Sequence, residues 1–377
     1  MQSAEHRQPR LGRLHAKTLA PFSMPDPCHW ANCGWAQVRR RQRVASSYSE
    51  YRSHMVPDAI LLQSFGGPEG PADLDAFLAN VLRGRRIPPG RLEKVKEQYM
   101  LLGGRSPLNG LNRELAAAIE ALYAQRGERI PVYVGNRNWH PYLADTLRRM
   151  VAAGVERAAV VTTSAYSSYS GCRQYLEELR LATKEVGSKT PGLFRVGPYF
   201  DQDGFLQPLA DGLGEVYRHV PAATPVLMSA HSIPESMAAS CEYENQLRYV
   251  AAAVAARVGI DASLVHVVYQ SRSGSPSQPW LGPDIIDVLD RLAGACDAVV
   301  VAPIGFVSDH MEVVYDIDVA AAQHAETVGL KLVRSATSGP DPRFAAMLVG
   351  LVDALEPHVA KRNWCFEGCC TSPTTGP

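Results

Sequence analysis

From Asp58 onward, short apolar runs alternate with longer stretches in which apolar residues recur at helical spacing. The short runs are apolar throughout, a pattern typical of parallel strands that helices cover on both faces. The eight predicted strands are 59–63, 131–135, 158–164, 193–197, 225–230, 264–270, 298–303 and 330–334. The main helices predicted between them are 112–125, 142–153, 173–184, 234–257 and 283–295.

This alternation predicts βαβ units and therefore a doubly wound, Rossmann-like α/β fold. Eight strands suggest two sheets, so we expect two similar parallel-sheet lobes with a cleft between them. The predicted first lobe is 56–165 and the second is 166–340. A final helix over 341–362 is expected to pack back onto the first lobe.

Two terminal segments lie outside this pattern. Residues 1–54 hold nine basic and three acidic residues, whereas the rest of the chain holds 29 basic and 35 acidic residues. Residues 1–55 lack a core-forming pattern, so we interpret them as a disordered or non-native leader. The remainder is acidic, which argues against nucleic acid as a partner. Residues 363–377 form a cysteine-rich tail.

The sequence contains no run of about 18 consecutive apolar residues, so no integral membrane segment is expected. No apolar segment follows the N-terminal charges as it does in an export signal. These features predict a cytoplasmic protein. In that compartment, eight cysteines favour metal binding or isolated thiols over a disulfide framework.

Polar side chains follow several predicted strands of the second lobe. His231 follows 225–230, Ser271 follows 264–270, and a segment ending in Glu312 follows 298–303. Ligands of such folds collect at the carboxyl ends of the strands. The sequence therefore predicts a site at this edge that contains His231 and Glu312.

The residue types at this edge suit metal and proton chemistry. A neutral imidazole accepts a proton or holds a metal ion, and a carboxylate stabilises a cation beside it. No glycine-rich phosphate motif opens a helix, so no nucleotide is indicated. His310 either supports the site or caps a helix. Asp316 could lie one turn beyond Glu312, although a solvated helix face accounts equally well for Asp316 and Asp318.

Several segments resemble the ferrochelatase family. The segment Ser229-Ala230-His231-Ser232-Ile233-Pro234 is similar to the signature around the active-site histidine, and 303–312 is similar to the segment with the active-site glutamate. Further similar segments are 66–68, 103–107, 137–139, 269–272 and 279–283. The similarity covers about 58–355 in the family's own order. The resemblance is greatest to actinobacterial-type coproporphyrin III ferrochelatases.

The resemblance implies a lyase that inserts Fe²⁺ into coproporphyrin III, giving coproheme in haem biosynthesis. His231 and Glu312 would be its catalytic residues and would hold the Fe²⁺ substrate. Alternative functions are a protoporphyrin IX ferrochelatase and a cobalt or nickel chelatase acting on sirohydrochlorin. A non-enzyme alternative is a two-lobed tetrapyrrole- or metal-binding protein. The oligomeric state is not predicted.

The resemblance also implies that the segments of Arg83, Tyr99, Ser106 and Tyr175 line the porphyrin. Phe65 stands where some members carry an iron-coordinating tyrosine, so we expect it to form an apolar wall instead. Other candidates are Ile87, Leu101, Leu102 and Trp280 for the walls, and Arg85, Arg86 and Arg105 for the carboxylates. The sequence shows no hydrophobic lip between 83 and 108, which favours the four-carboxylate substrate coproporphyrin III.

The tail brings together three cysteines, Cys365, Cys369 and Cys370, and Cys172 follows the third predicted strand. Several ferrochelatases carry a [2Fe–2S] cluster on one mid-chain and three C-terminal cysteines, and four thiolates are what such a cluster requires. The resemblance therefore implies a cluster on these four residues, with a structural or redox-sensing role. The alternative is a disordered tail with reactive thiols.

Overall fold

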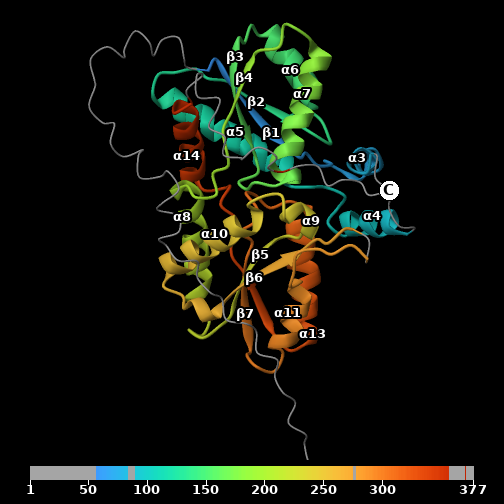
Figure 1. The fold of residues 1–377 in the computed structure, drawn as a ribbon, viewed down its shortest axis with the longest axis vertical. Helices are drawn as coiled ribbons and strands as arrows, with labels where there is room; N and C mark the ends of the chain where they lie inside the picture. The colour runs from blue at the N-terminus through green and yellow to red at the C-terminus, as the bar shows by residue number, and fades with distance from the viewer. Residues whose placement is uncertain (1–56, 84–89, 275–276, 356–369, 371–377) are drawn as a thin grey trace, which may run out of the picture.

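Two four-stranded parallel sheets organise the chain in the computed structural model, which describes residues 57–83, 90–274, 277–355 and 370. The first sheet has the order β2-β1-β3-β4 and the second has the order β6-β5-β7-β8. Their strands are β1 (Ala59–Ser64), β2 (Val132–Asn136), β3 (Arg157–Thr162), β4 (Gly192–Arg195), β5 (Val226–His231), β6 (Val265–Gln270), β7 (Ala298–Ala302) and β8 (Lys331–Arg334). The predicted two-lobed α/β fold is confirmed (Figure 1).

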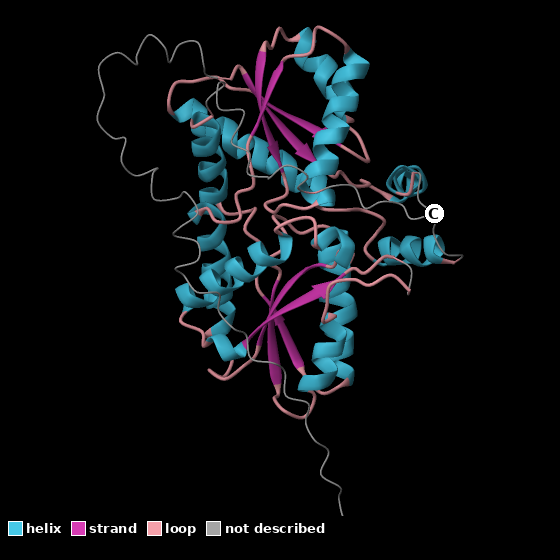
Figure 2. Cartoon of the chain, viewed as in Figure 1, coloured by secondary structure: helices cyan, strands magenta, loops and turns pink. Residues whose placement is uncertain are grey.

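Helices cover the sheets because the central strands are apolar on both faces. Every residue of β1 and of β7 is buried, as expected for strands covered on two sides. Figure 2 shows helices on either side of each sheet. The longer helices are α5 (Leu108–Gln125), α6 (Leu143–Ala152), α7 (Gln174–Val186), α8 (Asp203–Tyr217), α10 (Tyr243–Val258), α11 (Ile285–Leu292) and α14 (Pro342–Asp353).

Shorter elements lie mainly between the lobes or at strand ends. They are η2 (Pro71–Asp73), α3 (Leu74–Val81), α4 (Arg91–Leu101), η3 (Tyr169–Arg173), α9 (Glu235–Ala238), η4 (Ala262–Leu264), α12 (Met311–Val313), η5 (Val314–Ala321) and α13 (Ala322–Thr327). Figure 1 shows α3 and α4 projecting to one side at the level where the two lobes meet. Both η3 and η5 are π-helices.

The strand β4 corrects one predicted boundary. We assigned 193–197 to the second lobe, 166–340, but β4 pairs with β3 in the first sheet. The reason is that α7 is a crossover helix, which returns the chain to the sheet it has just left. The remaining division into lobes stays a prediction.

Several predicted features lie outside the described residues. They are the leader 1–55, most of the tail 363–377 with Cys365 and Cys369, and the porphyrin candidates Arg85, Arg86 and Ile87. Within the described part of the chain, none of the helices combines the length and the apolar character needed to cross a bilayer.

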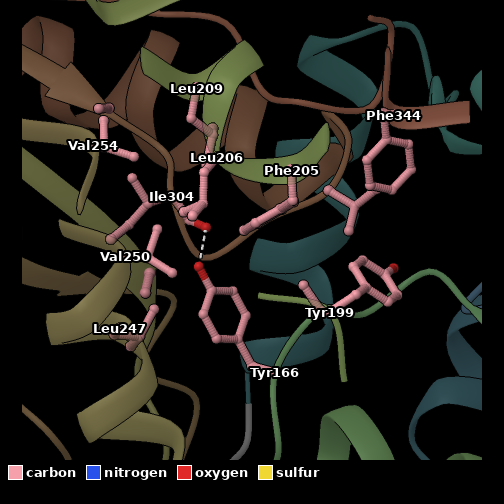
Figure 3. Close-up of a cluster of buried hydrophobic side chains, with 14 of the residues drawn as sticks. Tyr166, Tyr199, Phe205, Leu206, Leu209, Leu247, Val250, Val254, Ile304 and Phe344 are labelled. Carbon is pink, nitrogen blue, oxygen red and sulfur yellow. Dashed lines mark hydrogen bonds between the residues drawn. The ribbon is translucent and has the colours of Figure 1, made fainter. Parts of the chain in front are cut away.

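One hydrophobic core extends across both lobes. It includes Ile60 and Leu62 of β1 together with Val226 and Met228 of β5, all fully buried. The helix α14 packs against α5 and α8 and adds Phe344 to this core. Figure 3 shows Phe344 beside Tyr199 and Phe205. Apolar burial therefore holds the lobes together.

Buried hydrogen bonds also join the lobes. The Tyr166 hydroxyl, after β3, donates to the Ile304 carbonyl, after β7, at 2.6 Å (Figure 3). Beside it, the backbone N–H of Ser167 donates to Oε1 of Gln246 at 2.8 Å, and Nε2 of Gln246 donates back to the Ser167 hydroxyl at 3.0 Å. Paired polar groups in a dry interface fix its register, because a shift would leave them unsatisfied.

We predict that Phe344→Ala lowers the free energy of unfolding by about 3–5 kcal/mol, the usual cost of removing a buried aromatic ring from a core. Leu181→Ala is the control, because Leu181 is 63% exposed and its loss should cost under about 0.5 kcal/mol. Urea denaturation measures both. Equal effects of the two substitutions would contradict a shared core at Phe344.

Candidate active site

Two neighbouring strand ends bring His231 and Glu312 together. His231 is the last residue of β5, Glu312 lies in α12 after β7, and β5 pairs with β7. The His231 Nε2 and Glu312 Oε2 atoms are 3.5 Å apart. A Cβ at Gly305 would lie 2.5 Å from the Cβ of Ala230, so only glycine lets the chain after β7 pass so close to β5. The predicted pair therefore meets at the strand edge.

Hydrogen bonds orient the His231 ring. Its Nδ1 faces the Ser232 carbonyl, which can only accept, so Nδ1 carries the proton. The other ring nitrogen, Nε2, faces the Glu312 carboxylate. The Tyr243 hydroxyl of α10 donates to the His231 carbonyl at 3.0 Å. In a neutral ring whose Nδ1 donates to that carbonyl, Nε2 is the nitrogen that can accept a proton or a metal ion.

The backbone around Glu312 is held from two sides. Its N–H donates to Nδ1 of His310 at 3.1 Å, and its carbonyl accepts from Nε2 of Gln270 at 3.3 Å. Burial lowers the pKa of His310, which suits a ring whose Nδ1 must stay unprotonated to accept. Of the two roles predicted for His310, capping the helix that carries Glu312 is the one with an observed contact.

Asp316 and Asp318 have different surroundings on η5. Burial raises the pKa of Asp316 from 3.8 to about 6, while the Ser271 hydroxyl donates to its carboxylate and opposes that rise. Asp318 instead pairs with Arg334, with 2.6 Å between Oδ1 and Nε. A fully solvated helix face therefore does not describe Asp316. The negative charge of Glu312 adds to the rise in the pKa of Asp316.

Aromatic side chains of the first lobe form a cluster around α3. The rings of Phe65, Tyr99 and Trp139 pack around Phe77 with centroid distances of 5.8–6.3 Å. Burial raises the pKa of Tyr99, and the negative charge of Glu312 adds to the rise. Tyr99 on α4 therefore lies close enough to Glu312 to sense its charge, although the two residues belong to different lobes.

The other described porphyrin candidates vary in exposure. Ser106 is 4% exposed, and its hydroxyl accepts from the Leu108 N–H at 3.4 Å at the start of α5. Tyr175 is 5% exposed, and burial raises its pKa to about 12. Arg83 is exposed and donates to Asn80. Trp280 is half-buried and pairs with Pro234, three residues after His231.

Of the four predicted cluster ligands, the described residues include Cys172 in η3 and Cys370. The Cys370 N–H donates to the Ser240 carbonyl at 2.8 Å, and Cys370 is 2% exposed. Ser170, two residues before Cys172, contacts Met237 of α9. Among the described residues, no three His, Cys, Asp or Glu side chains form a group that could hold a metal ion.

Two residues that shape this edge, Tyr243 and Arg334, were not predicted from the sequence. Ser271 has a φ of 63°, an unusual conformation for a serine, and this conformation aims its hydroxyl at Asp316. Ser271 follows a predicted strand, which was a weak signal. Tyr243 and Arg334 act through long-range contacts that no local pattern indicates.

We predict that Asp316→Asn stabilises the protein increasingly between pH 4 and pH 6. The folded-state pKa lies above the unfolded value, so the unfolded chain ionises first, and the folded state loses stability as the pH rises through that window. Asparagine never ionises, so the melting-temperature difference from wild type should grow and then level off above about pH 6. The exposed Asp297→Asn is the control. A difference that does not vary with pH would contradict the buried-acid interpretation.

Comparison with known proteins identifies the family of this sequence. A family model described as ferrochelatase matches residues 57–355. The coproporphyrin III ferrochelatase of Frankia alni is 48% identical over 345 residues, covering 85% of this chain and 88% of that protein. The corresponding protein of Streptomyces coelicolor is 45% identical, covering 85% and 95% of the two chains. A ferrochelatase of Rhodopirellula baltica is 47% identical, covering 78% and 85%.

Solved structures give a more distant likeness. SirB from Bacillus subtilis, determined with Fe³⁺, has a TM-score of 0.48 at 12% identity, covering 81% of this chain and 96% of that one. The sequence comparison is far stronger, since the family match spans nearly all of the described residues. The chain belongs to the ferrochelatase family.

Proposed function

We propose that this protein inserts Fe²⁺ into coproporphyrin III and releases coproheme. The observation that carries the proposal is the His231–Glu312 pair, 3.5 Å apart at two adjoining strand ends. The negative charge of Glu312 contributes to the raised pKa of Tyr99, which links the pair to the aromatic residues of the first lobe. Relatives of 45–48% identity that bear the name coproporphyrin III ferrochelatase support this choice of porphyrin.

The two side chains suit the two halves of the reaction. Insertion replaces two pyrrole N–H protons by one Fe²⁺ ion, so two protons must leave as the cation enters. In the neutral ring, Nε2 of His231 can take a pyrrole proton, and the Glu312 carboxylate can attract and hold Fe²⁺. Asp316 lies beside them with a pKa raised to about 6, so it can pass protons onward near neutral pH.

The porphyrin would lie between the lobes, with its flat face against Phe65 and Tyr99. The Arg137 guanidinium lies 5.8 Å from the Phe65 ring centroid, which brings a positive charge to this wall. Arg83 and Arg105 are exposed and could pair with carboxylates at the rim. Ser106 and Tyr175 are more buried, and their contact with the macrocycle stays a prediction. The cytoplasmic location of the protein also stays a prediction.

The direct test is anaerobic turnover with Fe²⁺, followed by loss of porphyrin fluorescence. Coproporphyrin III should be converted with a higher kcat/KM than protoporphyrin IX, because its four carboxylates can engage more cationic partners. Co²⁺ with sirohydrochlorin tests the related chelatase activity. Preference for protoporphyrin IX would correct the substrate, and no turnover of any free-base porphyrin would reject the proposal.

We predict that His231→Ala lowers kcat by at least about 10²-fold, the usual loss when a positioned acid–base group is removed. Glu312→Gln should also slow insertion, because it keeps the shape and removes the charge. The Kd for porphyrin should change little in either variant. Measurements of kcat, porphyrin Kd and melting temperature distinguish a chemical role from a structural one.

A second histidine–carboxylate pair supplies matched controls. His324 and Asp290 are 2.7 Å apart, and their exposures, 29% and 54%, are close to the 30% and 52% of His231 and Glu312. His324→Ala and Asp290→Asn should retain near-normal turnover. If His231→Ala behaves like His324→Ala in a folded protein, His231 is not catalytic.

We further propose a [2Fe–2S] cluster held by Cys172, Cys365, Cys369 and Cys370. Two observations fit it. The Cys370 N–H bonds to Ser240 in the turn after α9, and Ser170, two residues before Cys172, contacts Met237 within α9. Nη2 of Arg195 lies 3.9 Å from Sγ of Cys172, so a positive charge faces a sulfur that must bind iron as a thiolate. When bound, the cluster would fix the tail against the fold or respond to oxidants.

We predict that anaerobically purified protein is brown, with about two irons and two sulfides per chain. Cys172→Ser and Cys370→Ser should bleach the colour and remove acid-labile sulfide. Cys296→Ser is the control, because Cys296 lies beside α11 and away from that turn. Cys241 follows Ser240 directly, so Cys241→Ser tests whether a neighbouring thiol replaces a ligand. Colour that survives both Cys172→Ser and Cys370→Ser would reject the ligand set.

A further inference from the structure

The segment that carries Glu312 contains four acidic residues with different partners. Asp309 precedes Glu312, and Asp316 and Asp318 follow it. Arg334, at the end of β8, contacts the first and the last of the four. Among the described residues, the carboxylates that Arg334 contacts are those of Asp309 and Asp318. The arginine therefore pairs with the outer two acids, and the inner two remain beside His231.

The contact of Arg334 uses the whole guanidinium group. Nη1 and Nη2 donate to the two carboxylate oxygens of Asp309 at 3.2 and 3.0 Å, and Nε donates to Asp318 at 2.6 Å. The Thr337 hydroxyl adds a bond to Asp309 at 3.2 Å. The Arg334 side chain is only 20% exposed. A lysine has no such planar fork and cannot make this set of bonds.

The position of this arginine links it to the geometry of the site. The chain between Asp309 and Asp318 holds the capping His310, Glu312 and the π-helix η5. Arg334 ties both ends of that chain to β8, which pairs with β7 in the second sheet. A shift of about 1 Å in a reacting group can slow catalysis about 10²-fold, so an anchor at both ends matters for Glu312.

The contact also affects charge. Without Arg334, Asp309 and Asp318 would each lose the cation that compensates a partly buried carboxylate. Carboxylates are good ligands for divalent metal ions, and these two lie three and six residues from Glu312. The arginine thus keeps two potential metal ligands occupied at the edge of the site.

We infer that Arg334 is a positioning residue for metal insertion, which holds the Glu312 segment in place and withholds Asp309 and Asp318 from the incoming metal ion. This role rests on the proposed function. The role concerns entry of the metal ion and not removal of the pyrrole protons. Arg334 lies at the end of β8, and β7 separates that strand from β5 and His231.

The experiment compares Arg334→Gln and Arg334→Lys with Arg343→Gln and Arg343→Lys. Arg343 is a matched control, because it also bridges two carboxylates, Asp211 and Asp341, each at 2.6 Å. We expect Arg334→Gln to lower kcat about 10-fold or more and to raise the KM for Fe²⁺. The KM for porphyrin should stay within about twofold of wild type. The Arg343 variants should lose thermal stability and keep turnover.

A second measurement does not depend on turnover. Calorimetric titration with Co²⁺, without porphyrin, should reveal an additional metal-binding event in Arg334→Gln that is absent from wild type and from Arg343→Gln. Adding Asp309→Asn and Asp318→Asn to Arg334→Gln should remove that event. Arg334→Lys keeps the charge and loses the fork, so it serves both measurements if the glutamine variant does not fold.

The outcomes separate the two proposals. If wild type does not insert iron, the proposed function fails, and the Co²⁺ titration alone decides the role of Arg334. If wild type is active while the Arg334 variants lose only stability, as the Arg343 variants do, the inference is overturned. Extra Co²⁺ binding together with a raised KM for Fe²⁺ supports it.

Discussion

The site depends on one constraint, the parallel pairing of β5 with β7. In a parallel sheet the carboxyl ends of neighbouring strands lie side by side, so the residues that follow them must meet. The order β6-β5-β7-β8 makes this the point where the chain crosses from one side of β5 to the other. His231 ends β5, and the segment with Glu312 follows β7. The two side chains therefore meet at this edge although they lie far apart in the sequence.

A second set of contacts relates this edge to the first lobe. Tyr166 and Tyr243 are both buried, with ring centroids 5.8 Å apart. The Tyr166 hydroxyl donates to the Ile304 carbonyl, and the Tyr243 hydroxyl donates to the His231 carbonyl. Each such bond contributes about 1 kcal/mol, but breaking one leaves a buried carbonyl without a donor, which costs more. The lobes consequently hold the histidine backbone and the aromatic wall in fixed relation, as an enzyme that encloses a flat substrate requires.

The sequence predicted what local patterns determine. The apolar run 298–303 became β7, and His231 and Glu312 were found because polar residues directly follow such runs. The lobe of β4 was assigned wrongly, since strand pairing depends on where α7 returns the chain. Neither the φ of Ser271 nor the π-helix η5 was predicted, because tertiary contacts impose both conformations against the local preferences of the residues. Arg334 escaped because its partners lie 16 and 25 residues away.

The distribution of charge at the edge follows from burial. A site that takes in a dication and releases two protons needs a base that is neutral beforehand and a carboxylate that is ionised. Nδ1 of His231 donates to a carbonyl, so in the neutral ring Nε2 is the basic nitrogen and faces Glu312. The Glu312 side chain is 52% exposed, whereas burial raises the pKa of the more enclosed Asp316 to about 6. Glu312 in α12 and Asp316 in η5 thus differ in their contact with water, and Arg334 pairs with the two further acids of this segment, Asp309 and Asp318.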